Sequence, residues 1–404
     1  MPDATCAPFN LPPHPTPHGT MTVMSHPEAL AILADRIPAP DWLDLSNYAS
    51  AHYIAGDLAL ALRYARNAVL LARNSSTLLN LGVILEASGQ FREALALFAE
   101  AQPLDPDNIV LGGALADGLL RVGRWAEGWP LYTRYHAAPG GLARFLPEWT
   151  GRESLRGKRI LVHEGGGFGD SFYFLRWLPR LTSWGAHITY AAPPSLLVLL
   201  ALQPYIAAGL ATVDAHIMTL DFRPWNYFTS VLALGHKLGV TPQDVLWRGP
   251  YIAAPVRPCP LSRRRPRVGL CWRAGEGNYP RAHRTLTDAQ RDRIVAAAPH
   301  VQWVSLTRDH TLPGARWQPR LYDWSDTAAA IAALDLVVTV DTGVAHCAGA
   351  MGKPVWVILP GASAWQYGLD SDRSLMYPSM RLFRNHGEGN DSAVAALARA
   401  LEAL

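Results

Sequence analysis

The 404-residue sequence has little excess charge of either sign: 36 Lys and Arg stand against 33 Asp and Glu, for a formal net charge of +3. A dedicated nucleic-acid binder carries a much larger positive charge, so we predict no nucleic acid among the partners of this chain. Any phosphate that it binds must be held by a local site.

The sequence also lacks a cysteine cluster, because its four cysteines, at positions 6, 259, 271 and 347, are far apart and form no C-x-x-C pair. This spacing argues against a zinc knuckle and against a disulfide framework. The composition is typical of a protein of the reducing cytoplasm, which is the location that we predict.

Long apolar runs are missing as well. The runs at 195–203 and 334–340 are far shorter than the roughly 20 residues that cross a bilayer, so we predict no membrane span. Residues 1–26 are rich in proline and histidine and lack the basic start and apolar segment of a signal peptide. We expect residues 1–26 to be a disordered tail.

Apolar residues make up 49% of the chain, enough for packed cores, and the length suggests two or three domains at about 150 residues each. Two segments rich in proline or glycine, at 137–141 and 253–266, mark predicted domain boundaries. The predicted domains are helical repeats at 27–141, an α/β domain at 152–252, a linker at 253–266 and a second α/β domain at 267–404. We interpret the basic run Arg263–Arg265 in the linker as a solvated face.

Residues 75–108 fit the 34-residue tetratricopeptide pattern, and the register extends to 42–74 and 109–141. Gly82 stands where two helices approach closely, Gly89 where the chain turns, and Phe98 on the inner face of the second helix. Three units are about the minimum for a stack of repeats that supports itself. Such arrays present a concave surface, so we predict a groove for a protein partner, with a purely structural spacer as the alternative.

From residue 158 onward the pattern alternates between β and α segments, which predicts parallel sheets with right-handed crossovers. The predicted strands lie at 159–163, 186–192, 211–220, 267–272, 301–306, 336–340 and 355–359, and the predicted helices include 287–297, 327–334, 345–351 and 392–404. In open α/β sheets, ligands bind at the carboxyl ends of the strands. The loops after Val162, Trp272, Val340 and Leu359 are therefore the candidate site loops.

The strongest local motif is Asp341-Thr342-Gly343-Val344-Ala345-His346, which follows an apolar strand and opens a helix. The free N–H groups and the dipole of a helix start attract anions, and Asp341 or Thr342 can cap this one. Gly343 would let a ligand approach the backbone, and His346 would donate to a phosphate oxygen. The alternative is an ordinary helix cap with a packed histidine.

A basic, glycine-rich segment follows the first strand of the second α/β domain. Arg273 and Arg284 in this segment carry charges that can neutralise a diphosphate. The segment should lie at the same sheet edge as Asp341, and that shared location is the main argument for a diphosphate site.

The run Glu164-Gly165-Gly166-Gly167-Phe168-Gly169-Asp170 stands at the corresponding turn of the first α/β domain. Its spacing is not the dinucleotide fingerprint, which disfavours an oxidoreductase. Gly165, Gly167 and Gly169 would allow close approach of an acceptor, and Asp170 could take a proton from its hydroxyl. The alternatives are that Asp170 is only a helix cap and that Glu164 is the base.

Pro360 and Gly361 begin a loop at the next strand end, and Trp365 in that loop is a candidate stacking face for a nucleotide or a sugar.

Taken together, these segments resemble the donor half of family 9 glycosyltransferases, the heptosyltransferase type. The resemblance rests on Asp341 to His346, on Gly352-Lys353-Pro354 and on the tail Tyr377 to Arg384. The combination with tetratricopeptide repeats is similar to that of O-linked N-acetylglucosamine transferases.

The resemblance implies a helical array followed by a GT-B fold of two Rossmann-like domains, and an inverting transfer from a nucleotide-sugar that needs neither a metal nor a cofactor. It implies Asp170 as the base, and Arg273, Arg284, Asp341, Thr342, Gly343, His346, Pro360 and Gly361 as donor contacts. Departures from the family pattern in the acceptor half leave a second hypothesis, a catalytically degenerate scaffold that binds proteins through its repeats.

Overall fold

The computed structural model describes residues 40–136, 142–206, 210–212, 224–245, 249–275, 284–361, 363–385 and 390–404. The chain forms two compact units, Met1–Leu119 and Leu120–Leu404. The predicted tail at 1–26 lies outside the described residues.

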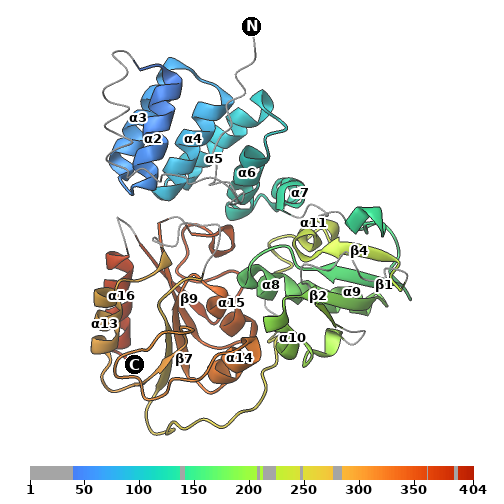
Figure 1. The fold of residues 1–404 in the computed structure, drawn as a ribbon, viewed down its shortest axis with the longest axis vertical. Helices are drawn as coiled ribbons and strands as arrows, with labels where there is room; N and C mark the ends of the chain where they lie inside the picture. Colours follow the sequence, from blue (N-terminus) through green and yellow to red (C-terminus); the bar gives the residue numbers. More distant parts are fainter. Residues whose placement is uncertain are drawn as a thin grey trace, which may run out of the picture. The chain divides into compact units, whose positions relative to one another are not determined.

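Antiparallel helices build the first unit (Figure 1). They are α2 (Trp42–Ile54), α3 (Leu58–Leu71), α4 (Ser75–Ala87), α5 (Phe91–Ala101) and the first part of α6 (Ile109–Arg121). Helices α2, α4 and α6 begin at residues 42, 75 and 109, close to the interval of a 34-residue repeat. The assignment of these helices to the tetratricopeptide class stays a prediction.

Gly82 allows α4 and α5 to pack closely. A Cβ at this position would lie only 2.9 Å from Cδ1 of Phe98, whose ring is fully buried. Gly89, at the turn between the two helices, has a φ of +77°, a conformation that favours glycine. Both glycines thus have the structural roles that the repeat pattern predicts for them.

The second unit begins with the end of α6 and with α7 (Trp125–His136), followed by a sheet of four parallel strands. The strands are β1 (Arg159–His163), β2 (His187–Ala192), β3 (Leu210–Thr212) and β4 (Tyr227–Ser230), in the order β3-β2-β1-β4. The helices of this half include α8 (Phe168–Phe174), α9 (Leu178–Ser183), α10 (Pro194–Leu200) and α11 (Leu234–Lys237).

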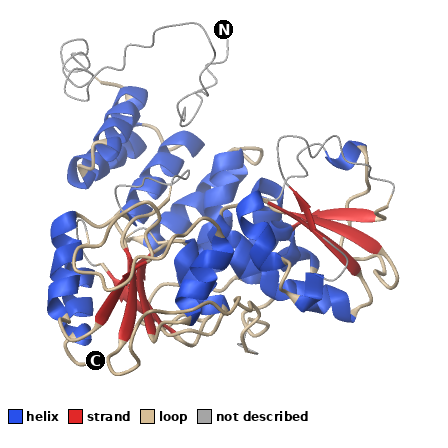
Figure 2. Ribbon diagram, turned by 60° about the horizontal axis from the view of Figure 1, so that its bottom comes forward, coloured by secondary structure: helices blue, strands red, loops and turns tan. Residues whose placement is uncertain are grey.

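The second sheet has five parallel strands in the order β6-β5-β7-β8-β9. They are β5 (Arg267–Cys271), β6 (Gln302–Ser305), β7 (Leu336–Val340), β8 (Val355–Leu359) and β9 (Met380–Arg384). Helices α13 (Asp288–Ala297) and α16 (Asp391–Leu401) cover one face, while α14 (Trp324–Ala332) and α15 (Gly343–Ala350) lie on the other (Figure 1). Figure 2 shows the two sheets as separate sets of strands.

The predicted parallel α/β pattern is confirmed, and β1, β7 and β8 have the predicted ends. Helix α14 begins three residues earlier than predicted because the Asp323 carboxylate accepts hydrogen bonds from the N–H groups of Ser325 and Asp326. Beyond Thr212, the predicted strand at 211–220 lies outside the described residues. The sequence pattern missed β4 and β9.

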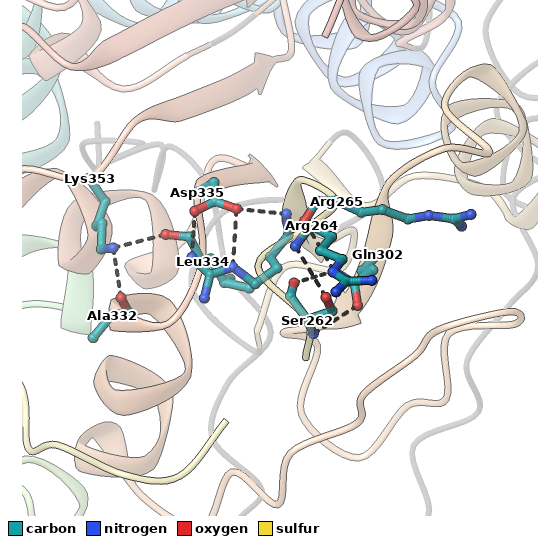
Figure 3. A network of polar contacts seen from close by, with 9 residues as sticks. Ser262, Arg264, Arg265, Gln302, Ala332, Leu334, Asp335 and Lys353 are labelled. Atoms are coloured by element: carbon teal, nitrogen blue, oxygen red, sulfur yellow. Dashed lines mark hydrogen bonds and ion pairs between the residues drawn. The ribbon is translucent and has the colours of Figure 1, made fainter. Parts of the chain in front are cut away.

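Polar contacts hold the Pro-rich linker to the amino edge of the second sheet (Figure 3). The Gln302 amide bonds the backbone of Ser262 and the carbonyl of Arg265, at distances between 2.7 and 3.2 Å. The basic run 263–265 is exposed, in agreement with a solvated face. The carboxyl edge, on the opposite side of the sheet, carries the candidate site.

Candidate active site

The candidate donor residues follow neighbouring strands of the second sheet. Strand β7 pairs with β5 on one side and with β8 on the other, all in parallel. Arg273 follows β5, Asp341 follows β7 and Pro360 follows β8, with Gly361 next to it. The predicted location at one sheet edge is confirmed for these residues.

Helix α15 starts without a side-chain cap. Thr342 is the N-cap residue, with extended backbone, but it makes no capping hydrogen bond, and its hydroxyl lies 3.1 Å from that of Thr339. The first-turn N–H groups of Gly343 and Val344 are therefore available to a ligand or to water. The partial positive charge of the helix start adds to this preference for an anion.

Asp341 is buried directly before this helix. Its Oδ1 accepts a hydrogen bond of 2.9 Å from the Tyr367 hydroxyl. Burial raises the pKa of Asp341, and the nearby Arg284 guanidinium and the Tyr367 hydroxyl partly offset that rise. The carboxyl group of Asp341 is therefore part of the buried packing around this turn.

Arg284 reaches the same turn, with Nη1 lying 3.4 Å from the carbonyl oxygen of Asp341. Its Nε is buried and has no hydrogen-bond partner among the described residues. Arg273 is exposed. Among the described residues, no contact joins its guanidinium to Asp341. The residues between them, 276–283, lie outside the described part of the chain.

His346 is buried one turn into α15, between two tyrosines. Its Nδ1 lies 3.3 Å from the Tyr377 hydroxyl and its Nε2 lies 3.3 Å from the Tyr367 hydroxyl. Burial and the charge of Arg176 lower the pKa of His346 to about 3, so the ring is neutral. Neither ring nitrogen is free to donate to a ligand in this arrangement, in contrast to the prediction.

The start of α8 packs directly on α15. A Cβ on Gly169 would lie 3.0 Å from Cδ2 of His346. A Cβ on Gly343 would lie 2.7 Å from Trp324 Cη2 and 3.1 Å from Phe168 Cβ. The side of Gly343 on which a Cβ would lie is therefore filled by Trp324 and Phe168, so the predicted approach of a ligand on that side is wrong.

Asp170 is half-buried in the first turn of α8. Its Oδ2 accepts a hydrogen bond of 3.0 Å from the N–H of Gly167, the N-cap residue, and its Oδ1 lies 3.3 Å from Nε2 of Gln366. Burial raises the pKa of Asp170, and the hydrogen bond from Gly167 opposes this rise. Asp170 thus caps the helix from its third position while one oxygen faces the C-terminal half.

Glu164, the alternative base, lies at the end of β1. Its Oε1 accepts a hydrogen bond of 2.7 Å from the Ser171 hydroxyl, and its Oε2 is buried with no partner among the described residues. Burial raises the pKa of Glu164 to about 7.

The backbone between Glu164 and Asp170 is exposed from Gly165 to Phe168. A Cβ on Gly165 would contact the Ser230 hydroxyl at 2.7 Å, whereas one on Gly167 would meet only Asp170, at 3.8 Å. Open space for an acceptor therefore exists at Gly167 rather than at Gly165.

Trp365 is a packing residue and not a stacking face, which corrects the prediction. Only 4% of it is exposed, and the rings of Trp125, Trp129, Tyr132 and Tyr173 surround it at centroid distances of 5.4–6.0 Å. The next two residues, Gln366 and Tyr367, contact Asp170 and Asp341. Sequence reasoning missed both, although their position shortly after a strand end was an available signal.

Among the described residues, no group of His, Cys, Asp or Glu side chains is placed to hold a metal ion. Within the same residues, every helix is too short or too polar to cross a bilayer.

No family model matches the sequence. Protein FlbA of Caulobacter vibrioides is 28% identical over 343 residues, which cover 73% of this chain and 56% of that protein. The chain thus spans about half the length of this curated relative.

Solved structures to which the chain is similar include a family 9 glycosyl transferase from Veillonella parvula (15% identity, TM-score 0.44), and the match covers 62% of this chain and 99% of that one. E. coli ADP-heptose heptosyltransferase II has 16% identity and a TM-score of 0.41, over 61% and 98% of the two chains. A Thermobaculum terrenum O-GlcNAc transferase has 16% identity and a TM-score of 0.32, over 93% and 85%.

Proposed function

We propose that this chain is a glycosyltransferase that moves a sugar from a nucleotide-sugar to an acceptor hydroxyl, with inversion and without a metal. The observation that carries the proposal is the contact between α8 and α15. Through the Gly169–His346 contact, the turn that holds Asp170 adjoins the helix whose uncapped start follows Asp341. A proton acceptor and an anion site are thereby neighbours.

The donor diphosphate would lie at the start of α15. The first-turn N–H groups supply hydrogen bonds, Arg284 supplies charge from beside Asp341, and Arg273 follows the adjacent strand. His346 connects this helix to Tyr367 and Tyr377 through its two ring nitrogens and does not contact the phosphates. Pro360 and Gly361 border the same edge.

Asp170 would act as the base. It takes the proton of the acceptor hydroxyl while that oxygen forms a bond to the anomeric carbon. The bond from this carbon to the diphosphate oxygen breaks, and its electron pair leaves with the diphosphate. Arginines and helix N–H groups stabilise the departing charge, which is why the reaction would not need a metal.

The raised pKa of Asp170 suits this role, because a stronger base takes the hydroxyl proton more readily. The exposed backbone at Gly167 leaves room for the acceptor. The helices that precede the α/β halves would recruit a protein, either the acceptor or a partner, as a tetratricopeptide array does. We place this activity in the cytoplasm.

Asp170→Asn tests the proposal. It keeps the size and one hydrogen-bond acceptor but removes the base, so kcat should fall on the order of 10²–10⁴-fold while donor affinity changes little. The assay pairs turnover of a nucleotide-sugar panel with calorimetric donor binding, and Glu164→Gln tests the alternative base in the same assay. Equal turnover in Asp170→Asn would remove Asp170 from the role. A wild-type chain that binds none of the panel would favour the scaffold hypothesis.

A further inference from the structure

The segment Ser363–Tyr367, which follows β8, contacts two acidic groups of the candidate site, Asp170 and Asp341. Gln366 is 6% exposed, and its Nε2 lies 3.3 Å from Oδ1 of Asp170. The Tyr367 hydroxyl donates a hydrogen bond of 2.9 Å to Oδ1 of Asp341. The position of this short segment therefore determines whether Gln366 reaches Oδ1 of the proposed base.

Helix α7 holds the segment through Trp365. The Trp365 ring lies edge-on to Trp129 at 5.4 Å, to Tyr132 at 5.9 Å and to Trp125 at 6.0 Å. Edge-to-face contacts are the favoured geometry for aromatic pairs, and all three partners belong to α7. Arg121, the last residue of α6, is buried and donates a hydrogen bond to the Ser363 carbonyl.

Helix α7 is also attached to the half of the unit that carries Asp170. Trp129 donates its indole N–H to the Val240 carbonyl at 2.8 Å, and its ring lies 6.1 Å from that of Phe174, the last residue of α8. Tyr132 stacks on the same Phe174 at 6.2 Å. One helix thus contacts both the element that bears Asp170 and the segment that bears Gln366.

We propose that α7 belongs to the active site because it holds Gln366 against Asp170, an arrangement that we call the bracket. In this arrangement, Gln366 is a positioning residue for the base. The inference rests on the proposed function only in giving Asp170 a catalytic role. The bracket itself follows from the contacts of α7 with Trp365 and Phe174.

The bracket has an electrostatic consequence. The Gln366 amide hydrogen bond favours the ionised form of Asp170, as does the charge of His136 at the end of α7, whereas Asp341 disfavours it. The further titratable groups that interact with Asp170 are Glu164, Tyr173 and Tyr190. Loss of the amide donor should therefore raise the pKa of Asp170.

The first experiment compares Gln366→Met with wild type in the full chain. Aspartate labelled with ¹³C at Cγ reports the pKa of Asp170 directly, and Asp170→Asn identifies its resonance. We expect the pKa of Asp170 to rise, because the amide donor that favours the carboxylate is lost. We also expect kcat at neutral pH to fall about tenfold with little change in the donor KM, because the base is misplaced rather than removed.

Gln203→Met is the matched control. Gln203 is equally buried, but its amide bonds the carbonyls of Leu199 and Ala253, away from Asp170. This variant should leave the pKa of Asp170 at its wild-type value. An unchanged pKa in Gln366→Met would overturn the positioning role.

The second experiment tests the bracket through α7. Tyr132→Ala removes a ring that contacts both Trp365 and Phe174, and it should raise the pKa of Asp170 in the same direction as Gln366→Met. Tyr132→Phe keeps the ring and should restore the wild-type value. Tyr64→Ala, which removes a ring that packs on Tyr48 of α2, is the control for loss of an aromatic residue.

A wild-type value in Tyr132→Ala, with the fold retained by circular dichroism, would overturn the bracket. Because the titration needs no turnover, it tests the bracket even if no nucleotide-sugar proves to be a substrate. Failure of the proposed function and failure of this inference are therefore distinguishable.

Discussion

Three carboxylic acids near the starts of α8 and α15 have a raised pKa for the same first reason, burial, but their partners differ. Asp341 is held by a tyrosine hydroxyl and lies near an arginine, Asp170 accepts from a backbone N–H, and Glu164 has only the Ser171 hydroxyl. The acid with the fewest compensating partners should therefore depend most on pH for its contribution to stability.

We predict that Glu164 lowers the stability of the folded chain as pH rises. Its pKa is 4.5 when unfolded and about 7 when folded, so between these values the folded state holds more protons than the unfolded state. The free energy of unfolding then decreases as pH rises through this window. Allowing for partial exposure, we expect a loss of about 1 kcal/mol between pH 5 and pH 8.

Glu164→Gln keeps the carbonyl that accepts from Ser171 but cannot ionise, so it should remove this loss. Urea unfolding at pH 5 and pH 8 gives the loss of unfolding free energy for wild type and for the variant, and the two losses are compared. Glu402→Gln, at the exposed end of α16, controls for loss of a charge. A variant whose stability follows the wild-type pH dependence would contradict the prediction.

Single residues were harder to assign than motifs. The run Asp341 to His346 predicted a histidine facing a ligand, but the partners that enclose it, Tyr367 and Tyr377, lie 21 and 31 residues further along the chain. No local pattern marks such partners, because hydrogen bonds between distant segments depend on how the loops pack. The packed alternative for this histidine was available and agrees with the structure.

At the scale of elements, the junction between α8 and α15 depends on glycine. We predict that Gly343→Ala destabilises the chain by about 1–3 kcal/mol, because the added methyl group would overlap the Trp324 ring and crowd Phe168. Thermal unfolding measures the change. Gly275→Ala is the control, since a Cβ there meets nothing within 4 Å. Equal stability of the two variants would show that Trp324 yields without cost.

Elements with a strong apolar period were predictable, and those held by tertiary contacts were not. Strands β7 and β8 are continuous apolar runs, which is typical of strands buried on both faces of a parallel sheet. Strand β9 contains Arg381 and Arg384, whose charges mask its pattern, and it forms at the sheet edge beside β8. The turn Trp365–Tyr367 is positioned by the packing of Trp365 against α7, so no feature of its own sequence predicted it.

At the scale of the whole molecule, the two α/β halves belong to one compact unit that also includes α7. Arg176 illustrates their connection. Its guanidinium lies within 5.3 Å of the ring centres of Tyr173, Tyr251 and Tyr377. Tyr173 and Tyr251 come from the first half, and Tyr377 comes from the second half. Tyr377 in turn contacts His346 beneath the start of α15. The proposed donor site is thus supported by segments from across this unit.

A nucleotide that binds at the start of α15 should stabilise this unit as a whole. We predict that one of UDP, GDP, ADP or CMP raises the melting temperature, with about 2.7 kcal/mol of stabilisation at one hundred times its Kd. EDTA should leave this effect unchanged, because arginines and helix N–H groups neutralise the phosphates. Arg284→Ala should weaken it, whereas Arg399→Ala, at the far end of α16, should not. A chain that no nucleotide stabilises would refute the donor site, and a stabilisation abolished by EDTA would refute the metal-free mechanism.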